Sequence, residues 1–95
     1  MKVELSDEAR SAVARIDSWW RANRPSAPDL FLDELAQALV ALEDTPGIGA
    51  RYEPKPGVRR LLLRRTRYHL YFMEQPDRVF VVAVWSTSRG GGPQL

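Results

Sequence analysis

The chain has 95 residues, with 14 Lys and Arg against 12 Asp and Glu, a formal charge of +2 and no cysteine. This length predicts one domain over residues 1–95, with no room for a second hydrophobic core. The absence of cysteine excludes disulfides, thiol catalysis, zinc–thiolate sites and iron–sulfur clusters, and it is typical of proteins from a reducing cytoplasm.

The N-terminal residues, Met1 to Glu8, carry several charges and lack the apolar centre of a signal peptide. No segment approaches the roughly 20 consecutive apolar residues that a membrane-spanning helix needs. We therefore expect a soluble cytoplasmic protein that makes no membrane contact.

The first quarter of the chain predicts a strand followed by a helix. Charged and apolar residues alternate from Lys2 to Leu5, which favours a short leading strand that joins the sheet. Ser6 is suited to cap a helix that runs to about Asn23, with two acidic residues in its first turn. Because neighbouring helix positions lie about 100° apart, one of Trp19 and Trp20 is expected to be half exposed.

A second helix is predicted after the prolines of the segment 24–28, which end the first one. It is expected to begin near Pro28 or Asp29 and to end at Thr45-Pro46-Gly47. Its apolar positions follow helical spacing, so the two helices should form a hairpin with one apolar side.

Three apolar runs in the second half predict consecutive antiparallel strands. They are Val58 to Arg67, Tyr68 to Met73 and Val79 to Trp85, separated by Arg-Thr-Arg and by a Pro76-Asp77 turn. The last run is apolar on both faces, which favours the buried central strand. The short segment 51–53 is expected at the sheet edge, and residues 89–95 are expected to form a flexible tail.

These elements predict an α+β domain in which an N-terminal strand and a helical hairpin pack on a three- to four-stranded antiparallel sheet. The hydrophobic core should form where the hairpin meets one face of the sheet. The residues expected there are Trp19, Trp20, Leu35, Leu39, Leu42, Leu62, Leu70, Phe72, Val82 and Val84.

Charge is distributed unevenly along the chain. The segment from Arg51 to Arg67 holds many cations and the single anion Glu53, whereas the second helix is acidic. Guanidinium groups bind phosphate through paired hydrogen bonds, so these arginines suit an anionic ligand. They also suit a solvated sheet margin that pairs with the second helix or with an acidic protein. The sequence leaves both alternatives open, and with them direct contact with nucleic acid.

His69 is the only histidine, and its side chain is the only one with an unperturbed pKa near neutrality. It could serve as a general base, but no second acid or base stands at a suitable spacing, so a strand residue that hydrogen-bonds a neighbour is favoured. A single histidine without cysteine argues against a transition-metal site, and no cofactor is expected.

Several motifs occur together between Ser6 and Pro93. The run from Pro56 to Phe72 joins arginines to a Tyr-His-Leu-Tyr-Phe strand, an acidic turn precedes the last strand, and Arg89-Gly90 and Gly92-Pro93 follow it. The second helix closes with Thr-Pro-Gly-Ile-Gly, which is similar to a Pro-Gly-x-Gly joint. This combination resembles the toxins of the RelE/ParE superfamily, on the ParE side.

The resemblance implies the toxin of a bacterial or plasmid-stabilising type II toxin–antitoxin system. ParE-like members resemble inhibitors that bind DNA gyrase, and a ParD-like antitoxin neutralises them; RelE-like members cut mRNA on the ribosome without a metal. The ribonuclease pattern has an arginine after the strand-opening tyrosine and a tyrosine near the C-terminus. Here His69 follows Tyr68, and no tyrosine lies beyond Tyr71, so we expect a ParE-like toxin that is not an enzyme.

The resemblance and the charge pattern together suggest which residues contact a partner by charge or stacking: Arg59, Arg60, Arg64, Arg65, Tyr68, Trp85 and Arg89. For Trp85, a plain structural role at the end of its strand is the alternative. A ribonuclease would instead gather Arg59, Arg60, His69 and Arg89 around the scissile phosphate. A third reading is a toxin-fold interaction module without toxicity. The oligomeric state is expected to be set by the antitoxin complex.

Overall fold

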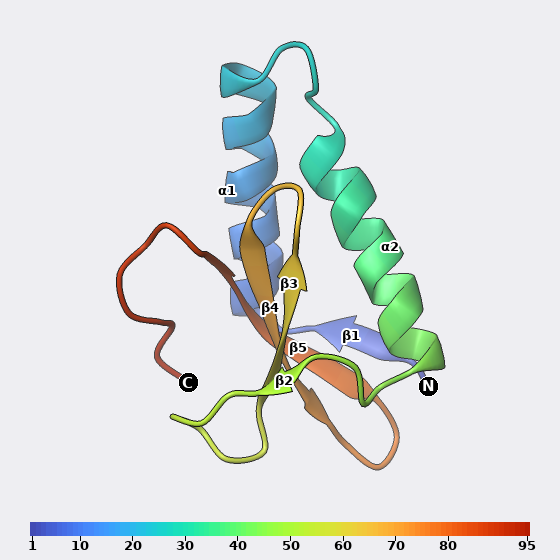
Figure 1. The fold of residues 1–95 in the computed structure, drawn as a ribbon. Helices are drawn as coiled ribbons and strands as arrows, with labels where there is room; N and C mark the ends of the chain where they lie inside the picture. Colours follow the sequence, from blue (N-terminus) through green and yellow to red (C-terminus); the bar gives the residue numbers. More distant parts are fainter.

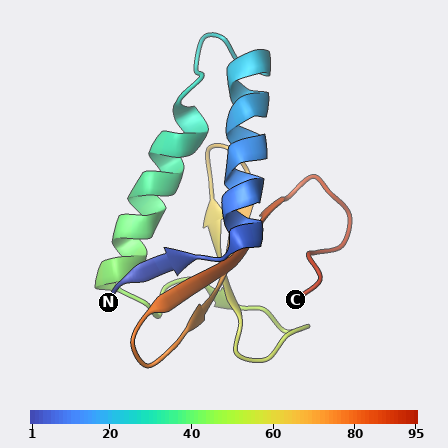
Figure 2. The same ribbon diagram turned by 180° about the vertical axis from the view of Figure 1, so that it is seen from behind.

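A helical hairpin covers one face of a five-stranded sheet in the computed structural model, which describes residues 1–95 (Figure 1). The elements in chain order are β1 (Val3–Leu5), α1 (Asp7–Asn23), α2 (Leu30–Asp44), β2 (Ala50–Arg51), β3 (Arg59–Leu63), β4 (Tyr68–Glu74) and β5 (Val79–Ser86). From behind, α1 and α2 stand side by side, with β1 running below them (Figure 2). The predicted α+β class, with its leading strand and helical hairpin, is confirmed.

The strand order in the sheet is β1-β5-β4-β3-β2, and every pair is antiparallel except β1 with β5. The sheet has one strand more than the three or four expected, because the two-residue β2 adds a strand at its edge. It is mixed and not purely antiparallel, because β1 pairs in parallel with β5. A parallel pair needs a long crossover between its strands, and here all the other elements lie between β1 and β5. The middle strand is β4. The run Val79 to Trp85 is an interior strand, paired on one side with β1 and on the other with β4, but it is not the middle one.

The start of α1 is fixed by Ser6, as predicted. Its Oγ accepts a hydrogen bond from the backbone N of Ala9 at 3.0 Å, and its own backbone N donates to the carbonyl of Val81 at 2.9 Å. One residue thus caps the helix and attaches it to β5. The second helix starts directly after Asp29 and stops before Thr45, also as predicted. Neither helix is long and apolar enough to cross a membrane.

The hydrophobic core lies between the helical hairpin and the facing side of the sheet. Its buried residues are Ala9, Ala12, Trp20, Phe31, Leu35, Ala38 and Leu42 from the helices and Leu63, Leu70, Phe72, Val79, Val81 and Val84 from the strands.

Four of the residues expected in the core are not among its buried members. Leu39 is partly buried and packs against the core, and the other three lie outside it. Leu62 lies on the opposite face of β3, because alternation along the strand turns Leu63 toward the helices. Val82 is the extra residue of a bulge in the pairing of β4 with β5. Trp19 is 46% exposed whereas Trp20 is 9% exposed, which confirms that only one of the two tryptophans fits inside.

The sheet face turned away from the helices is called the open face here. Arg60, Leu62, His69, Tyr71 and Trp85 lie on it by strand alternation and register. The C-terminal tail returns beside this face, since a side chain added at residue 92 would meet Tyr52 and Tyr71. The expectation that residues 89–95 are flexible stays a prediction.

Candidate functional site

The fold distributes the eight residues singled out from the sequence among four places. A cleft beside α1 is lined by Arg65, Tyr68 and Arg89. A pocket on the open face is lined by Arg60, Arg64 and His69. Arg59 is bonded to the α2–β2 loop, and Trp85 lies beside the C-terminal tail.

The cleft beside α1 has a volume of about 750 Å³ and is rich in arginine. It lies between α1, the turn that joins β3 to β4, and the residues that follow β5. No Asp or Glu is among its lining residues. Its cations are Arg15, Arg24, Arg65, Arg67 and Arg89, and we call it the arginine cleft.

Backbone pairing brings these separate parts of the chain together. The register of β4 and β5 places Tyr68 opposite Ser86, and the backbone N of Thr87 donates to the carbonyl of Arg67 at 2.9 Å. The residues that follow β5 are therefore held against the β3–β4 turn. The hairpin of β3 and β4 rises beside the helices in Figure 1. The residues at its tip, 65–68, line the cleft.

None of the five arginines in the cleft forms an ion pair. The ion pairs of the chain join Arg21 to Asp17 and Asp29, and Glu4 to Lys2 and Arg78. Two of the guanidinium groups of the cleft contact aromatic rings instead. That of Arg24 lies 5.1 Å from the ring centroid of Trp19, and that of Arg89 lies 4.0 Å from the ring centroid of Trp85. A cation over a ring keeps its net positive charge, so the cleft carries uncompensated charge.

Aromatic side chains form one wall of the arginine cleft. Trp20 is buried and donates from Nε1 to the hydroxyl of Tyr68 at 3.2 Å. Tyr68 in turn packs edge-on against Phe31, with the ring centroids 5.2 Å apart. Trp19 packs edge-on against Trp20 and stays half exposed. The wall is therefore packed against the core at Trp20 and exposed to solvent at Trp19.

The β3–β4 turn is held by Glu34 of α2. Its carboxylate accepts hydrogen bonds from the backbone N of Arg65 and from both the backbone N and Oγ1 of Thr66. Burial opposes ionisation of Glu34, but the hydrogen bonds from Thr66 and Arg65 outweigh it and lower the pKa of Glu34. The ionised carboxylate is thus the form that anchors the turn carrying two of the cleft's arginines.

The pocket on the open face has a volume of about 430 Å³ and contains His69 with Arg60 and Arg64. Burial, followed by the charges of Arg60 and Arg67, lowers the pKa of His69, so the neutral imidazole is favoured. The expectation that His69 hydrogen-bonds a neighbour was wrong. Its ring lies edge-on to Tyr71 with the centroids 6.0 Å apart, and none of the side-chain hydrogen bonds of the chain involves it.

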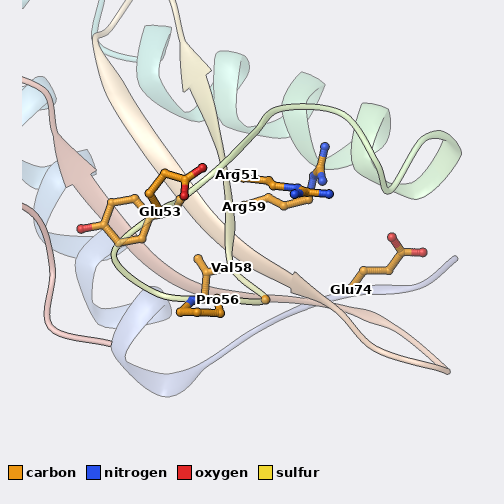
Figure 3. Close-up of a pocket in the computed structure, with 8 residues that line it drawn as sticks. Arg51, Glu53, Pro56, Val58, Arg59 and Glu74 are labelled. Carbon is orange, nitrogen blue, oxygen red and sulfur yellow. The ribbon is translucent and has the colours of Figure 1, made fainter.

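Arg59 is engaged within the fold. Its Nη2 donates to the carbonyls of Gly47 at 2.8 Å and Gly49 at 3.2 Å, which fastens the loop between α2 and β2. Gly49 has φ of 87°, and a Cβ there would collide with the carbonyl of Arg60. Figure 3 shows Arg51 and Arg59 extending side by side, with Glu53 and Glu74 to either side of them.

Trp85 lies half-buried beside the C-terminal tail. Its Nε1 is buried without an acceptor from the protein, and its ring lines a groove together with Pro93 and Leu95. The register of β4 and β5 places it opposite His69. Trp85 therefore lies on the open face and also contacts Arg89, whose guanidinium lies over the Trp85 ring.

Sequence reasoning missed Arg15, Trp19, Arg24 and Arg67 as members of a common site. Arg15 and Trp19 are four residues apart on α1, a spacing that places them on the same side of the helix, and this signal could have joined them. Arg24 and Arg67 are brought in by the tertiary fold. No three carboxylate or imidazole groups converge to form a set of metal ligands.

Known proteins with a similar sequence or structure are toxins of one family. A family model described as the ParE toxin of the type II toxin–antitoxin system parDE matches residues 3–90. No curated protein matches the sequence.

Solved structures of toxins share the architecture. The chromosomal ParDE system of P. aeruginosa is similar with a TM-score of 0.80 and 18% identity, over 90% of this chain and 95% of that one. The E. coli RelBE complex gives 0.63 and 20%, over 93% and 98%. The isolated E. coli RelE toxin also gives 0.63 and 20%, over 94% and 86%. At these identities the structures show a common fold.

Proposed function

Because the chain belongs to the ParE toxin family of type II toxin–antitoxin systems, we propose that it inhibits DNA gyrase by binding it in the cytoplasm, and that a ParD-like antitoxin neutralises it. The uncompensated charge of the arginine cleft suits recognition of an acidic or phosphate-bearing surface. This mode of action needs contacts and no bond chemistry in the toxin itself.

The arrangement of the four residues that a ribonuclease would use supports binding over catalysis. Of these, only Arg60 and His69 share a pocket. The guanidinium of Arg59 is bound to the carbonyls of Gly47 and Gly49, and that of Arg89 lies over Trp85. A metal-free phosphate cleavage requires cations and a proton-transfer group around one phosphorus atom, and this dispersal is the observation on which the proposal rests.

A free sheet edge offers a place for the antitoxin. The two residues of β2 pair only with Arg59 and Arg60 of β3, so the outer edge of Leu61–Leu63 has no strand partner. An extended peptide can add a strand to such an edge through backbone hydrogen bonds. The similar ParDE and RelBE structures are both toxin–antitoxin systems, which favours an antitoxin as the partner.

The test is a gyrase supercoiling assay with purified protein. We expect supercoiling to fall with increasing toxin and to recover when a ParD-like antitoxin is added. The double variant Arg65→Ala/Arg89→Ala should inhibit less than the natural chain, whereas Arg10→Ala, which removes a charge on an exposed part of α1, should inhibit as well as it does. Folded protein that leaves supercoiling intact at every concentration would overturn the proposal.

A second candidate is a ribosome-dependent mRNA endonuclease, and the open-face pocket favours it. That pocket holds a neutral imidazole at His69 beside Arg60 and Arg64, which is a proton acceptor next to phosphate-binding cations. This alternative expects His69→Ala to abolish toxicity and mRNA to be cut in the ribosomal A site. Intact mRNA in poisoned cells would exclude it.

A further inference from the structure

We propose that the arginine cleft binds single-stranded nucleic acid, with phosphates on its guanidinium groups and a base stacked at Trp19. The inference concerns the cleft's ligand alone and stands whether or not gyrase is the target. It rests on the charge of the cleft, its aromatic wall, its size and the conformation of Arg67.

The positive charge of the cleft favours a ligand with several negative charges. Five arginines from α1 and its C-terminal cap, the β3–β4 turn and the segment after β5 line one cavity, and no Asp or Glu lines it. The nearest acidic residue of the turn region, Glu34, is occupied by the backbone of Arg65 and by Thr66. A phosphodiester chain supplies evenly spaced charges that neutralise such a group and release their own counterions.

The aromatic wall favours nucleic acid over an acidic peptide. Trp19 lines the cleft and is 46% exposed, and Arg24 lies against it with the guanidinium 5.1 Å from the ring centroid. Nucleic-acid bases stack on such aromatic rings and guanidinium planes whatever their sequence. Carboxylates of a peptide would satisfy the arginines but would leave the flat surface of Trp19 without a matching partner.

The size of the cleft favours a single strand over a duplex. Its volume of about 750 Å³ lies within the range of about 300–1,000 Å³ in which pockets enclose small organic ligands. One or two nucleotides can enter such a space with their bases unpaired. The hydroxyl groups of Thr87 and Ser88 line the same cleft, and hydroxyls of this kind donate hydrogen bonds to phosphate oxygens.

Arg67 adopts a backbone conformation that is uncommon for its residue type. Its φ is 68°, in the left-handed region, and it is the only residue other than glycine with a positive φ in the chain. Glycine would occupy this position of the β3–β4 turn with less strain. An arginine here is explained if its side chain has a function in the cleft, because strain of this kind concentrates at binding sites.

The experiment measures fluorescence anisotropy of a short labelled oligo(dT) with the whole chain, between about 50 and 200 mM salt. We expect binding whose salt dependence becomes shallower by about 0.7 in the logarithmic slope for each cleft arginine removed, as in Arg24→Ala or Arg67→Gly. Trp19→Ala should weaken binding by roughly 5-fold or more, in keeping with the loss of one stacked base. Trp19→Phe should retain most of the affinity, because it keeps an aromatic face.

Two control variants and two competing ligands separate this inference from general attraction to a basic protein. Arg10→Ala removes one charge outside the cleft and should leave affinity nearly unchanged, and Arg67→Gly should keep the melting temperature of the natural chain. A glutamate-rich peptide of equal charge and a DNA duplex should both bind more weakly than the single strand. Equal or tighter binding of either, or binding that is insensitive to the cleft variants, would overturn the inference. Gyrase inhibition without oligonucleotide binding would overturn it while leaving the proposed function standing.

Discussion

Glu34 and Thr66 join the second helix to the β3–β4 turn through one carboxylate oxygen. Oε1 of Glu34 accepts hydrogen bonds from the backbone N of Thr66 at 2.9 Å and from its Oγ1 at 2.6 Å. The other oxygen accepts from the backbone N of Arg65 at 2.7 Å. The position of the cleft's arginines on this turn thus depends on a helix residue that lies outside the cleft.

Replacing the carboxylate should loosen this turn. Glu34→Gln removes the charge and one of the acceptor oxygens, so we expect the free energy of unfolding to fall by about 1.5–3 kcal/mol, the usual contribution of hydrogen bonds to a charged group. Urea denaturation measures this difference. Glu43→Gln, at an exposed position of the same helix, is the matched control and should change little. Equal stability of Glu34→Gln and the natural chain would contradict the anchoring role.

The carboxylate of Glu34 should also make the stability of the protein depend on pH. The pKa of Glu34 is lowered from its ordinary value of 4.5 because hydrogen bonds to the ionised form outweigh the effect of burial. Its contribution is therefore fully present above about pH 4.5 and is lost as the pH falls through the lower pKa of the folded state. Denaturation between about pH 6 and pH 3 should show a steeper loss of stability in the natural chain than in Glu34→Gln. Parallel curves would count against this assignment.

The two adjacent tryptophans should respond very differently to truncation. Trp20 is buried and its Nε1 donates to Tyr68, so Trp20→Ala should lower the free energy of unfolding by about 3–5 kcal/mol. Trp19→Ala should lower it by about 1 kcal/mol or less, because the ring is half exposed. Thermal or urea unfolding distinguishes them. A larger loss at Trp19 would mean that the two rings have been assigned to the wrong environments.

Arg59 should behave as a structural arginine. Arg59→Lys keeps the charge but replaces the guanidinium, whose Nη2 donates to the carbonyls of both Gly47 and Gly49, by an ammonium group on a shorter side chain. We expect a loss of about 1–3 kcal/mol in the free energy of unfolding, together with faster hydrogen exchange in the α2–β2 loop. Exchange rates that stay unchanged in this loop would indicate that Arg59 is available to a partner, as the sequence suggested.

Local features of the fold could be predicted because they depend on neighbours in the sequence. Ser6 and the acidic first turn mark the start of α1, and Thr45-Pro46 marks the end of α2. The α+β architecture follows from the order of these elements, and its likeness to RelE/ParE toxins is confirmed by the family match and by the shared fold.

Features set by distant pairing could not be predicted in this way. The choice of Leu63 over Leu62 for the core depends on the register of β3 with β4, and the bulge that displaces Val82 appears only once β5 is paired. The parallel pairing of β1 depends on a strand far along the chain. The arginine cleft has the same origin, since Arg15 and Arg67 meet only after α1 packs on the sheet. The site residues chosen from the sequence alone were therefore divided among separate surfaces.

The central claim is that this toxin acts by binding gyrase and performs no chemistry on its open face. The most direct measurement runs gyrase supercoiling and in vitro translation side by side, with the natural chain and with His69→Ala. The account predicts lost supercoiling, normal translation, and equal potency of the two proteins. Blocked translation with cleaved mRNA, unaffected gyrase and an inactive His69→Ala variant would contradict it and assign the activity to the open-face pocket.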